Sequence, residues 1–144
     1  NKKMKLLVQK LHPDAKMPRR ALAHDAGLDL CASEPVTLAP GERKGIPTGL
    51  AFAIPQGSVG LIWDKSGLAI KKGLKTMGGV IDAGYRGEIV VIAQNLSDEA
   101  IVFSVGEKVA QLLIQRIELL SPEEVSELPE SERKDAGFGS TGNY

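Results

Sequence analysis

Closely spaced turn residues cut this chain into short β-prone runs, and that spacing constrains the fold most. Sixteen glycines and eight prolines contribute to the breaks, which recur about every 8–12 residues. The runs expected to form strands are 5–11, 28–31, 36–38, 50–54, 59–63, 80–81, 89–92, 100–103 and 111–120. About ten short strands of this kind are typical of an all-β jelly-roll sandwich or barrel.

The length of 144 residues suits one domain with a substantial core. We assign residues 1–132 to a single β domain and residues 133–144 to a flexible C-terminal arm, because the last residues are Gly-rich and lack apolar periodicity. Only Ser121–Arg133 looks helical, with Pro122 at the first helical position after a Ser cap. Pro129 limits that helix to one or two turns.

Charge and composition exclude several classes of protein. The 18 basic and 18 acidic residues cancel, so a general attraction to nucleic acid is not expected. No apolar run approaches transmembrane length. Cys31, the single cysteine, excludes an internal disulfide and is expected to be a small buried thiol. Without a secretory segment, a cytoplasmic location is the expectation.

The stretch Gly79–Glu88 carries the densest set of functional side chains. Its sequence predicts a hairpin between Val80-Ile81 and the run at 89–92, with Gly84 at positive φ in the turn. The turn would present the carboxylate of Asp82 beside the phenol of Tyr85. The alternative is a purely structural hairpin with a solvated turn.

Four other short motifs accompany this stretch in a fixed order. They are Ala26-Gly27-Leu28-Asp29-Leu30, Asp64-Lys65-Ser66-Gly67-Leu68-Ala69, Gly106-Glu107-Lys108-Val109-Ala110-Gln111-Leu112, and a tail from Arg133 to Gly142. The five motifs together resemble the homotrimeric dUTPase family, from about Ala26 to Gly142. The resemblance implies a homotrimer with sites at subunit interfaces and hydrolysis of dUTP to dUMP and pyrophosphate.

The resemblance assigns the nucleoside end of the site to the Gly79–Glu88 stretch. Asp82 would orient the attacking water, since an aspartate is ionised at neutral pH. Tyr85 would pack against C2′ and exclude a ribose hydroxyl. Backbone groups of Gly79, Val80 and Ile81 would read uracil. The plainer alternatives are a turn-capping Asp82 and a cross-strand packing Tyr85, and Arg86 looks structural, tying down the hairpin or a neighbouring chain.

The phosphates would be held by Lys65, Ser66, Gly67 and Gln111. The chain departs from the family pattern at Lys65, where arginine is usual; lysine keeps the charge but loses the planar fork. The preceding Asp64 could face solvent, pair with Lys65 or approach the metal. Gln111 could instead be a polar residue on the exposed face of a strand.

Asp29 resembles the acidic residue that helps to hold Mg²⁺ through water. Magnesium keeps several waters and is usually carried in by phosphates, so no dense protein cage is expected. His12 and His24 are too isolated in the sequence to form one.

The tail resembles the arm that closes over bound dUTP. Phe138 would stack on uracil, Ser140, Thr141 and neighbouring amides such as that of Gly139 would hold the γ-phosphate, and Arg133 would add charge. Without the resemblance, a disordered terminus would be the better interpretation.

Two other functions are open to the same scaffold. A dCTP deaminase would need a catalytic Glu in the strand after the hairpin, where this chain has Ile92. A non-catalytic nucleotide-binding or regulatory module would not need Asp82. Release of pyrophosphate, of ammonia, or of neither separates the three.

Overall fold

The computed structural model describes residues 4–139 and 142, and in them the chain is all-β apart from one short helix, α1 (Ser66–Lys72). The strands are β1 (Leu7–Lys10), β2 (Leu28–Cys31), β3 (Val36–Leu38), β4 (Arg43–Pro47), β5 (Leu50–Ala53), β6 (Ser58–Trp63), β7 (Leu74–Met77), β8 (Val80–Ile81), β9 (Val90–Asn95), β10 (Ile101–Phe103) and β11 (Lys108–Arg116). The all-β prediction is confirmed.

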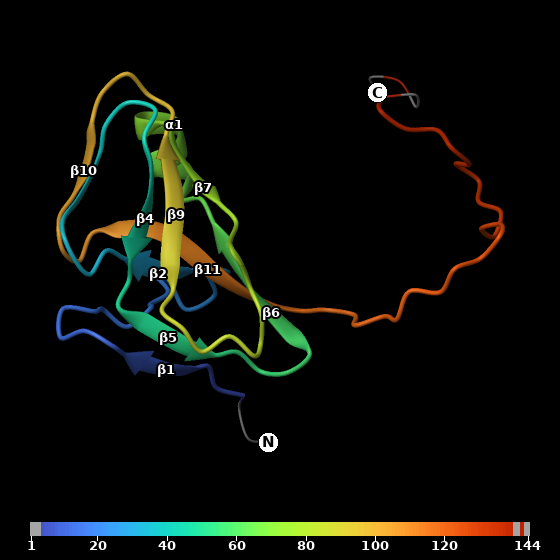
Figure 1. The fold of residues 1–144 in the computed structure, drawn as a ribbon, viewed down its shortest axis with the longest axis horizontal. Helices are drawn as coiled ribbons and strands as arrows, with labels where there is room; N and C mark the ends of the chain where they lie inside the picture. Colours follow the sequence, from blue (N-terminus) through green and yellow to red (C-terminus); the bar gives the residue numbers. More distant parts are fainter. Residues whose placement is uncertain (1–3, 140–141, 143–144) are drawn as a thin grey trace.

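The strands form antiparallel sheets that enclose one apolar core (Figure 1). A four-stranded sheet has the order β2-β11-β6-β8 and a three-stranded sheet the order β4-β9-β7, with two further pairs, β1-β5 and β10-β3. Both larger sheets contribute to the core, with Leu30 and Leu112 from one and Ile46 and Val91 from the other fully buried. Alternating burial along β9 is what a strand with one face toward a core requires. The result is the expected jelly-roll-like sandwich.

Two strands were missed by the sequence interpretation, β4 and β7. Strand β4 reads Arg-Lys-Gly-Ile-Pro, and only Ile46 of these five is buried. Strand β7 contains Lys75 between buried Leu74 and Thr76. Both pair with β9, one on each side, so hydrogen bonding to a central strand, rather than apolar content, makes these segments strands.

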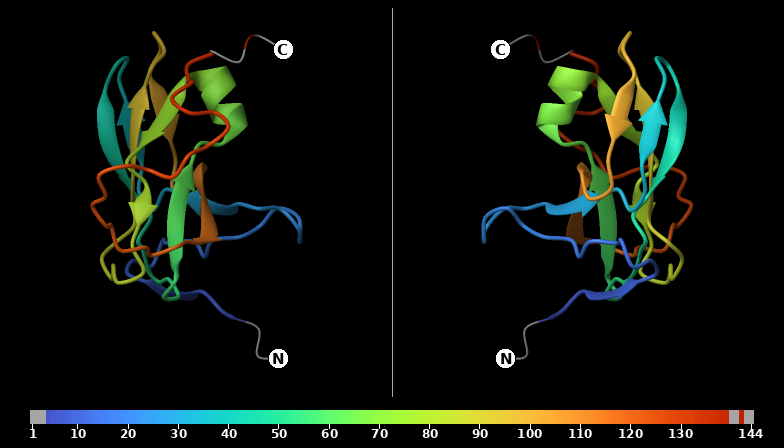
Figure 2. Two further views of the ribbon diagram at one scale, coloured as in Figure 1. Left: turned by 90° about the vertical axis from the view of Figure 1, so that its right-hand side faces the viewer. Right: turned by 90° about the vertical axis from the view of Figure 1, so that its left-hand side faces the viewer.

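Helix α1 replaces the loop that was expected at Ser66-Gly67. Leu68, Ala69 and Lys71 favour helix, and Gly73 ends it in the left-handed conformation at φ 69°. Figure 2 shows α1 at the end of the body opposite strand β1. No helix in the described part of the chain is long and apolar enough to cross a membrane.

Residues 121–133 form no helix or strand, so the helix expected at Ser121–Arg133 is absent. Val125 and Leu128 there are exposed, so no apolar face is buried to stabilise a helix this short. After β11 the chain leaves the body as an irregular segment (Figure 1).

The predicted hairpin between Val80-Ile81 and the run at 89–92 is also wrong. Strand β8 pairs with β6, whereas β9 pairs with β4 and β7. Gly78 and Gly79 cause the switch: their φ values of 66° and 89° turn the chain from β7 onto the edge of β6, where Ile62 N–H donates to Gly79 O at 2.8 Å. Residues 82–88 are therefore a loop between two sheets, and Gly84, unlike Gly78 and Gly79, does not adopt positive φ.

Candidate active site

Three residues predicted to bind phosphate or metal meet in one cavity of about 270 Å³, which we call the Asp29 cavity. Asp29 comes from β2, Gln111 from β11, and Lys65 from the junction of β6 and α1. Register places Gln111 between Asp29 on one side and Trp63 on the other. Asp29 and Gln111 are far apart in the sequence, and the pairing of β2 with β11 brings them together.

Asp29 is a buried carboxylate bound by two ammonium groups. Lys65 Nζ lies 2.5 Å from its Oδ1 and Lys108 Nζ 3.0 Å from its Oδ2. Burial raises the pKa of Asp29, but the hydrogen bonds and charges of Lys65 and Lys108 outweigh burial and hold the pKa below its usual value. Both carboxylate oxygens are therefore already occupied by cations.

Lys108 was not among the predicted site residues, and the reason is a β-bulge. Residues three apart point to opposite faces of a regular strand, so Lys108 and Gln111 would not be expected to share a site. The register between β11 and β2 shifts between Lys108 and Ala110, and the extra residue restores a common face. The only indication in the sequence that Lys108 belongs to the site was that it lies in the same motif as Gln111.

Gln111 is held at the floor of the Asp29 cavity. Its Nε2 donates to the backbone carbonyl of Asp64 at 2.8 Å. A Cβ on Gly27 would lie 2.0 Å from Gln111 Oε1, so glycine at position 27 leaves the space that this conformation of the Gln111 side chain occupies. Gln111 is half-buried inside the site rather than on an exposed strand face.

Asp64 takes none of the three positions considered from sequence. Its Oδ1 accepts hydrogen bonds from Thr76 N–H at 2.6 Å and Thr76 Oγ1 at 2.9 Å, and its Oδ2 accepts from Lys75 Nζ at 2.8 Å. Burial raises the pKa of Asp64, but the hydrogen bonds from Lys75 and Thr76 outweigh burial and lower it. Asp64 therefore fastens the turn that carries Lys65 to strand β7.

We expect Asp64→Ala to lower the free energy of unfolding by about 1–3 kcal/mol, because buried Thr76 loses the acceptor for two donors. Asp64→Asn, which keeps one acceptor oxygen, should cost less. A lowered pKa stabilises the fold above the ordinary aspartate value of 3.8, and this stabilisation is lost as pH falls through the folded pKa. Denaturant unfolding between pH 3 and 7 should therefore show a weaker acid dependence in Asp64→Asn. Exposed Asp98→Asn is the control, and an unfolding midpoint of Asp64→Ala equal to that of the control would contradict this role.

Four of the predicted nucleoside-binding residues, Val80, Ile81, Asp82 and Tyr85, line a second cavity of about 300 Å³, here called the Asp82 cavity; Gly79 does not line it. Val80, Val90 and Ile92 give it apolar walls, and Asp82 and Tyr85 stand at its polar side. The backbone closes the turn, since Tyr85 N–H donates to Asp82 O at 3.1 Å. Among the described residues the Asp82 carboxylate makes no hydrogen bond or ion pair, so it does not cap the turn and stays free for a ligand or water.

Tyr85 folds back over Gly87. Its hydroxyl donates to Glu88 O at 2.9 Å, and a Cβ at position 87 would lie 2.5 Å from that hydroxyl. Glu88 is itself anchored, because its Oε2 accepts from Gly49 N–H at 2.9 Å. Arg86 Nη1 donates to the carbonyls of Ala83 and Tyr85, which confirms that Arg86 ties down its own loop. Glu88 lines the Asp82 cavity and was missed from sequence.

The predicted glycines play unequal parts. The Gly79 carbonyl is occupied by Ile62 N–H, and a Cβ there would lie 2.9 Å from Ile62 O. Glycine at this position therefore serves close strand packing, and its carbonyl, which has two lone pairs, can still accept one further donor. Ser66 and Gly67 are exposed in the first turn of α1 next to Lys65, and a Cβ at Gly67 would meet nothing within 4 Å.

The arm contributes to neither cavity in the described part of this chain. Arg133 Nε donates to Ala136 O at 2.8 Å within a local turn. The Phe138 ring is fully exposed, with a backbone φ of 49°. Ser140 and Thr141 lie outside the described residues.

The two cavities are separate, and no lining residue is common to them. Within residues 4–139 and 142, no group of three or more His, Cys, Asp or Glu side chains is close enough to hold a metal ion. Asp29, with both oxygens bound by lysines, does not fit direct coordination. It fits a role as acceptor for the water shell of an ion if Lys65 moves away.

Comparison with known proteins gives one consistent family. A family model described as dUTPase matches residues 13–142. Proteins named deoxyuridine 5'-triphosphate nucleotidohydrolase are similar to the chain: that of Mycobacterium leprae is 48% identical and covers 96% of this chain and 96% of its own. That of Rhodococcus erythropolis is 44% identical and covers 98% of this chain and 88% of its own.

Solved structures agree. A Staphylococcus bacteriophage 80alpha dUTPase mutant with dUpNHpp has a TM-score of 0.91 at 32% identity, covering 96% of this chain and 98% of its own. A mutant dUTPase from phage phi11 of S. aureus, described for the coordination of a structural Mg(II) ion, has a TM-score of 0.84 at 30% identity, covering 88% of this chain and all of its own.

Proposed function

Because the chain belongs to the dUTPase family, whose members are dUTP diphosphatases, we propose that it hydrolyses dUTP to dUMP and pyrophosphate by attack of an Asp82-oriented water on the α-phosphorus. The proposal of dUTP as the substrate is supported by the similarity to dUTP nucleotidohydrolases over nearly the whole chain. The mechanism is proposed from the Asp82 carboxylate, which lies beside Tyr85 and has no partner among the described residues.

Asp82 acts as the base in this proposal. Its exposed carboxylate is unengaged within the described chain and lies at the polar side of a cavity with apolar walls. A carboxylate so placed can accept a hydrogen bond from water and take its proton as the bond to phosphorus forms. Uracil would occupy the apolar part, read by backbone groups of Gly79, Val80 and Ile81.

Lys65 and Gln111 serve the phosphates, together with Ser66 and Gly67. In the free protein Lys65 is held by Asp29, and we propose that it exchanges this carboxylate for a phosphate oxygen. Asp29 then keeps Lys108 as its partner, so the buried charge is not left uncompensated. Gln111 Nε2, now on the Asp64 carbonyl, faces the same cavity.

Magnesium, when bound, would offset the negative charge of the phosphates. The described residues fit it only through the Asp29 carboxylate and water, once Lys65 has moved. The structural Mg(II) of the phage phi11 relative supports the use of this metal in the family.

A complete site needs more than one copy of the chain. The Asp29 cavity and the Asp82 cavity share no lining residue, and the described arm reaches neither. We therefore propose the homotrimer implied by the family, in which one chain supplies Asp82, another supplies Lys65, Ser66 and Gln111, and an arm supplies Arg133 and Phe138–Thr141. A cytoplasmic location stays a prediction.

The test is to incubate the full chain with dUTP and Mg²⁺ and to measure pyrophosphate and ammonia. We expect pyrophosphate and dUMP in equal amounts and no ammonia. Ammonia would indicate a deaminase. Ile92 stands where dCTP deaminases have the catalytic Glu; its side chain is an apolar wall of the Asp82 cavity and cannot transfer protons. Binding of dUpNHpp with neither product would indicate a non-catalytic module.

We expect Tyr85→Ala to raise the use of UTP relative to dUTP, because the ring would no longer exclude a 2′-hydroxyl. Gly87→Ala should change that ratio in the same direction, since its Cβ would lie 2.5 Å from the Tyr85 hydroxyl and displace the ring. The measurement is kcat/KM for both nucleotides, with Gly84→Ala as control, because a Cβ there meets nothing within 4 Å. An unchanged ratio in Tyr85→Ala would place the sugar selection elsewhere.

We expect Lys65→Ala to lower kcat/KM for dUTP by about 10-fold or more, the scale of one charged hydrogen bond, whereas Lys65→Arg keeps the charge and should be tolerated. Lys71→Ala on the exposed side of α1 is the matched control. If Lys65→Ala and the control behave alike, Lys65 only neutralises Asp29.

A further inference from the structure

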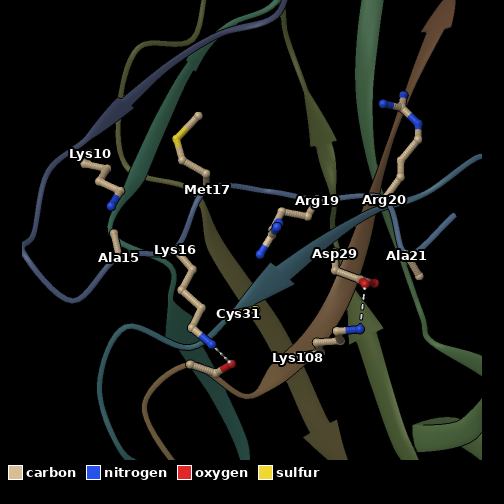
Figure 3. Close-up of a pocket in the computed structure, with 11 residues that line it drawn as sticks. Lys10, Ala15, Lys16, Met17, Arg19, Arg20, Ala21, Asp29, Cys31 and Lys108 are labelled. Atoms are coloured by element: carbon tan, nitrogen blue, oxygen red, sulfur yellow. Dashed lines mark hydrogen bonds and ion pairs between the residues drawn. The ribbon is translucent and has the colours of Figure 1, made fainter. Parts of the chain in front are cut away.

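A third cavity, of about 630 Å³, is also lined by Asp29, and the charged residues of its lining are mainly basic. We call it the basic cavity. Its charged residues are Lys10, Lys16, Arg19, Arg20, Lys108 and Asp29 (Figure 3). Five of the 18 basic residues but only one of the 18 acidic residues of the chain line it. In a chain with no net charge, this is a local concentration of positive charge.

Most side-chain N–H donors of the basic cavity have no partner within residues 4–139 and 142. Lys16 Nζ donates to Gly106 O at 3.2 Å and Arg20 Nε to Asp25 O at 2.9 Å, which leaves further donors on both groups. Among the described residues, the side chains of Lys10 and Arg19 make no hydrogen bond or ion pair. The single acidic residue, Asp29, is already bound by Lys65 and Lys108.

The backbone fixes the position of this positive charge. Asp29 N–H donates to Arg19 O at 2.7 Å, so the backbone of Arg19 is joined to the strand that carries Asp29. The contact of Lys16 with the Gly106 carbonyl and that of Lys108 with Asp29 hold two further cations, and Figure 3 shows both contacts as dashed lines. The remaining lining is small or apolar, and burial raises the pKa of the Cys31 thiol, so Cys31 adds no negative charge.

We propose that the basic cavity is a second anion-binding site, separate from the substrate site, for a pyrophosphate or triphosphate group. A planar guanidinium and several ammonium groups around one space match phosphate oxygens in charge and geometry. A volume of about 630 Å³ lies in the range of small-molecule sites. The basic cavity and the Asp29 cavity share only two lining residues, Ala21 and Asp29, so these two residues lie between the cavities.

The test uses the full chain with its substrate site filled by dUpNHpp. Filling that site rests on the proposed function, because it requires that the chain bind a dUTP analogue. Pyrophosphate is titrated by calorimetry at excess Mg²⁺. We expect one residual pyrophosphate site per chain. Arg19→Ala should lower its affinity for pyrophosphate by about 10-fold or more, and Arg19→Lys should lower it less. Lys71→Ala removes one exposed positive charge on α1 outside the cavity and should leave binding unchanged.

Two results would overturn the proposal. One is no pyrophosphate binding to the dUpNHpp-filled protein. The other is equal weakening by Arg19→Ala and Lys71→Ala, which would reveal only general charge attraction. dUTP turnover of the same variants is measured separately and should be unchanged in Arg19→Ala. Failure of the proposed hydrolysis would therefore appear in the turnover assay and failure of the second site in the titration.

Discussion

Asp82→Asn should lower dUTP turnover by about 100-fold or more, the usual loss when a general base is removed, while dUpNHpp still binds. The amide keeps the size and one acceptor of the carboxylate but cannot take a proton. Among the described residues the Asp82 side chain makes no hydrogen bond or ion pair, and its backbone carbonyl, which accepts from Tyr85 N–H, is unchanged by the substitution, so the loop that carries Tyr85 should not be disturbed.

The measurement is single-turnover hydrolysis together with dUpNHpp affinity. Asp98→Asn, another exposed aspartate in a loop, is the control. Turnover of Asp82→Asn at half the wild-type rate would remove Asp82 from the role of base. Loss of dUpNHpp affinity without a change in the chemical step would make it a binding residue instead.

A chain ending at Glu132 should also lose dUTP turnover by about 100-fold or more, because a closing arm excludes water and completes substrate positioning. Co-expression of this truncated chain with Asp82→Asn should then restore a measurable fraction of activity. Restoration requires that the arm of one chain close over Asp82 of another, since otherwise every site lacks either the base or the arm.

The structure supports an arm that leaves its own chain. From Ile117 onward the described residues form no helix or strand, and Leu119, Leu120 and Leu128 are 76%, 80% and 83% exposed. Apolar side chains exposed along one segment suit packing on another copy, and Pro122 and Pro129 stiffen the connection. Mixed trimers, verified by native mass spectrometry, with no more activity than the two variants summed would exclude a crossed arm.

Much of the architecture was accessible from sequence because short β-branched runs between Gly and Pro breaks leave few other folds. The strands at 28–31 and 36–38 were predicted with their boundaries, and those at 50–53 and 58–63 to within a residue. The motifs also identified Asp29, Lys65 and Gln111, which the structure brings into one cavity. Local signals suffice where strand propensity and burial agree.

Other features depended on tertiary pairing. Strands β4 and β7 exist because β9 lies between them, and β8 joins β6 rather than β9 because Gly78 and Gly79 turn the chain there. The helix expected at 121–133 had good local signals but nothing to pack against, whereas α1 ends on the left-handed Gly73 and is fastened through Asp64 to β7.

The sequence by itself determined the all-β class, the order of the motifs and the residue types of the site. Only the tertiary structure decided which side chains contact one another. It places Asp29 between Lys65 and Lys108, Asp64 on Thr76 and Gln111 in the space left by Gly27, and it leaves the Asp82 carboxylate without a partner among the described residues. The physical reason is that a hydrogen bond or ion pair needs atoms within about 3 Å. Strand register and a single bulge set those distances between residues far apart in the chain, and local propensity does not encode them.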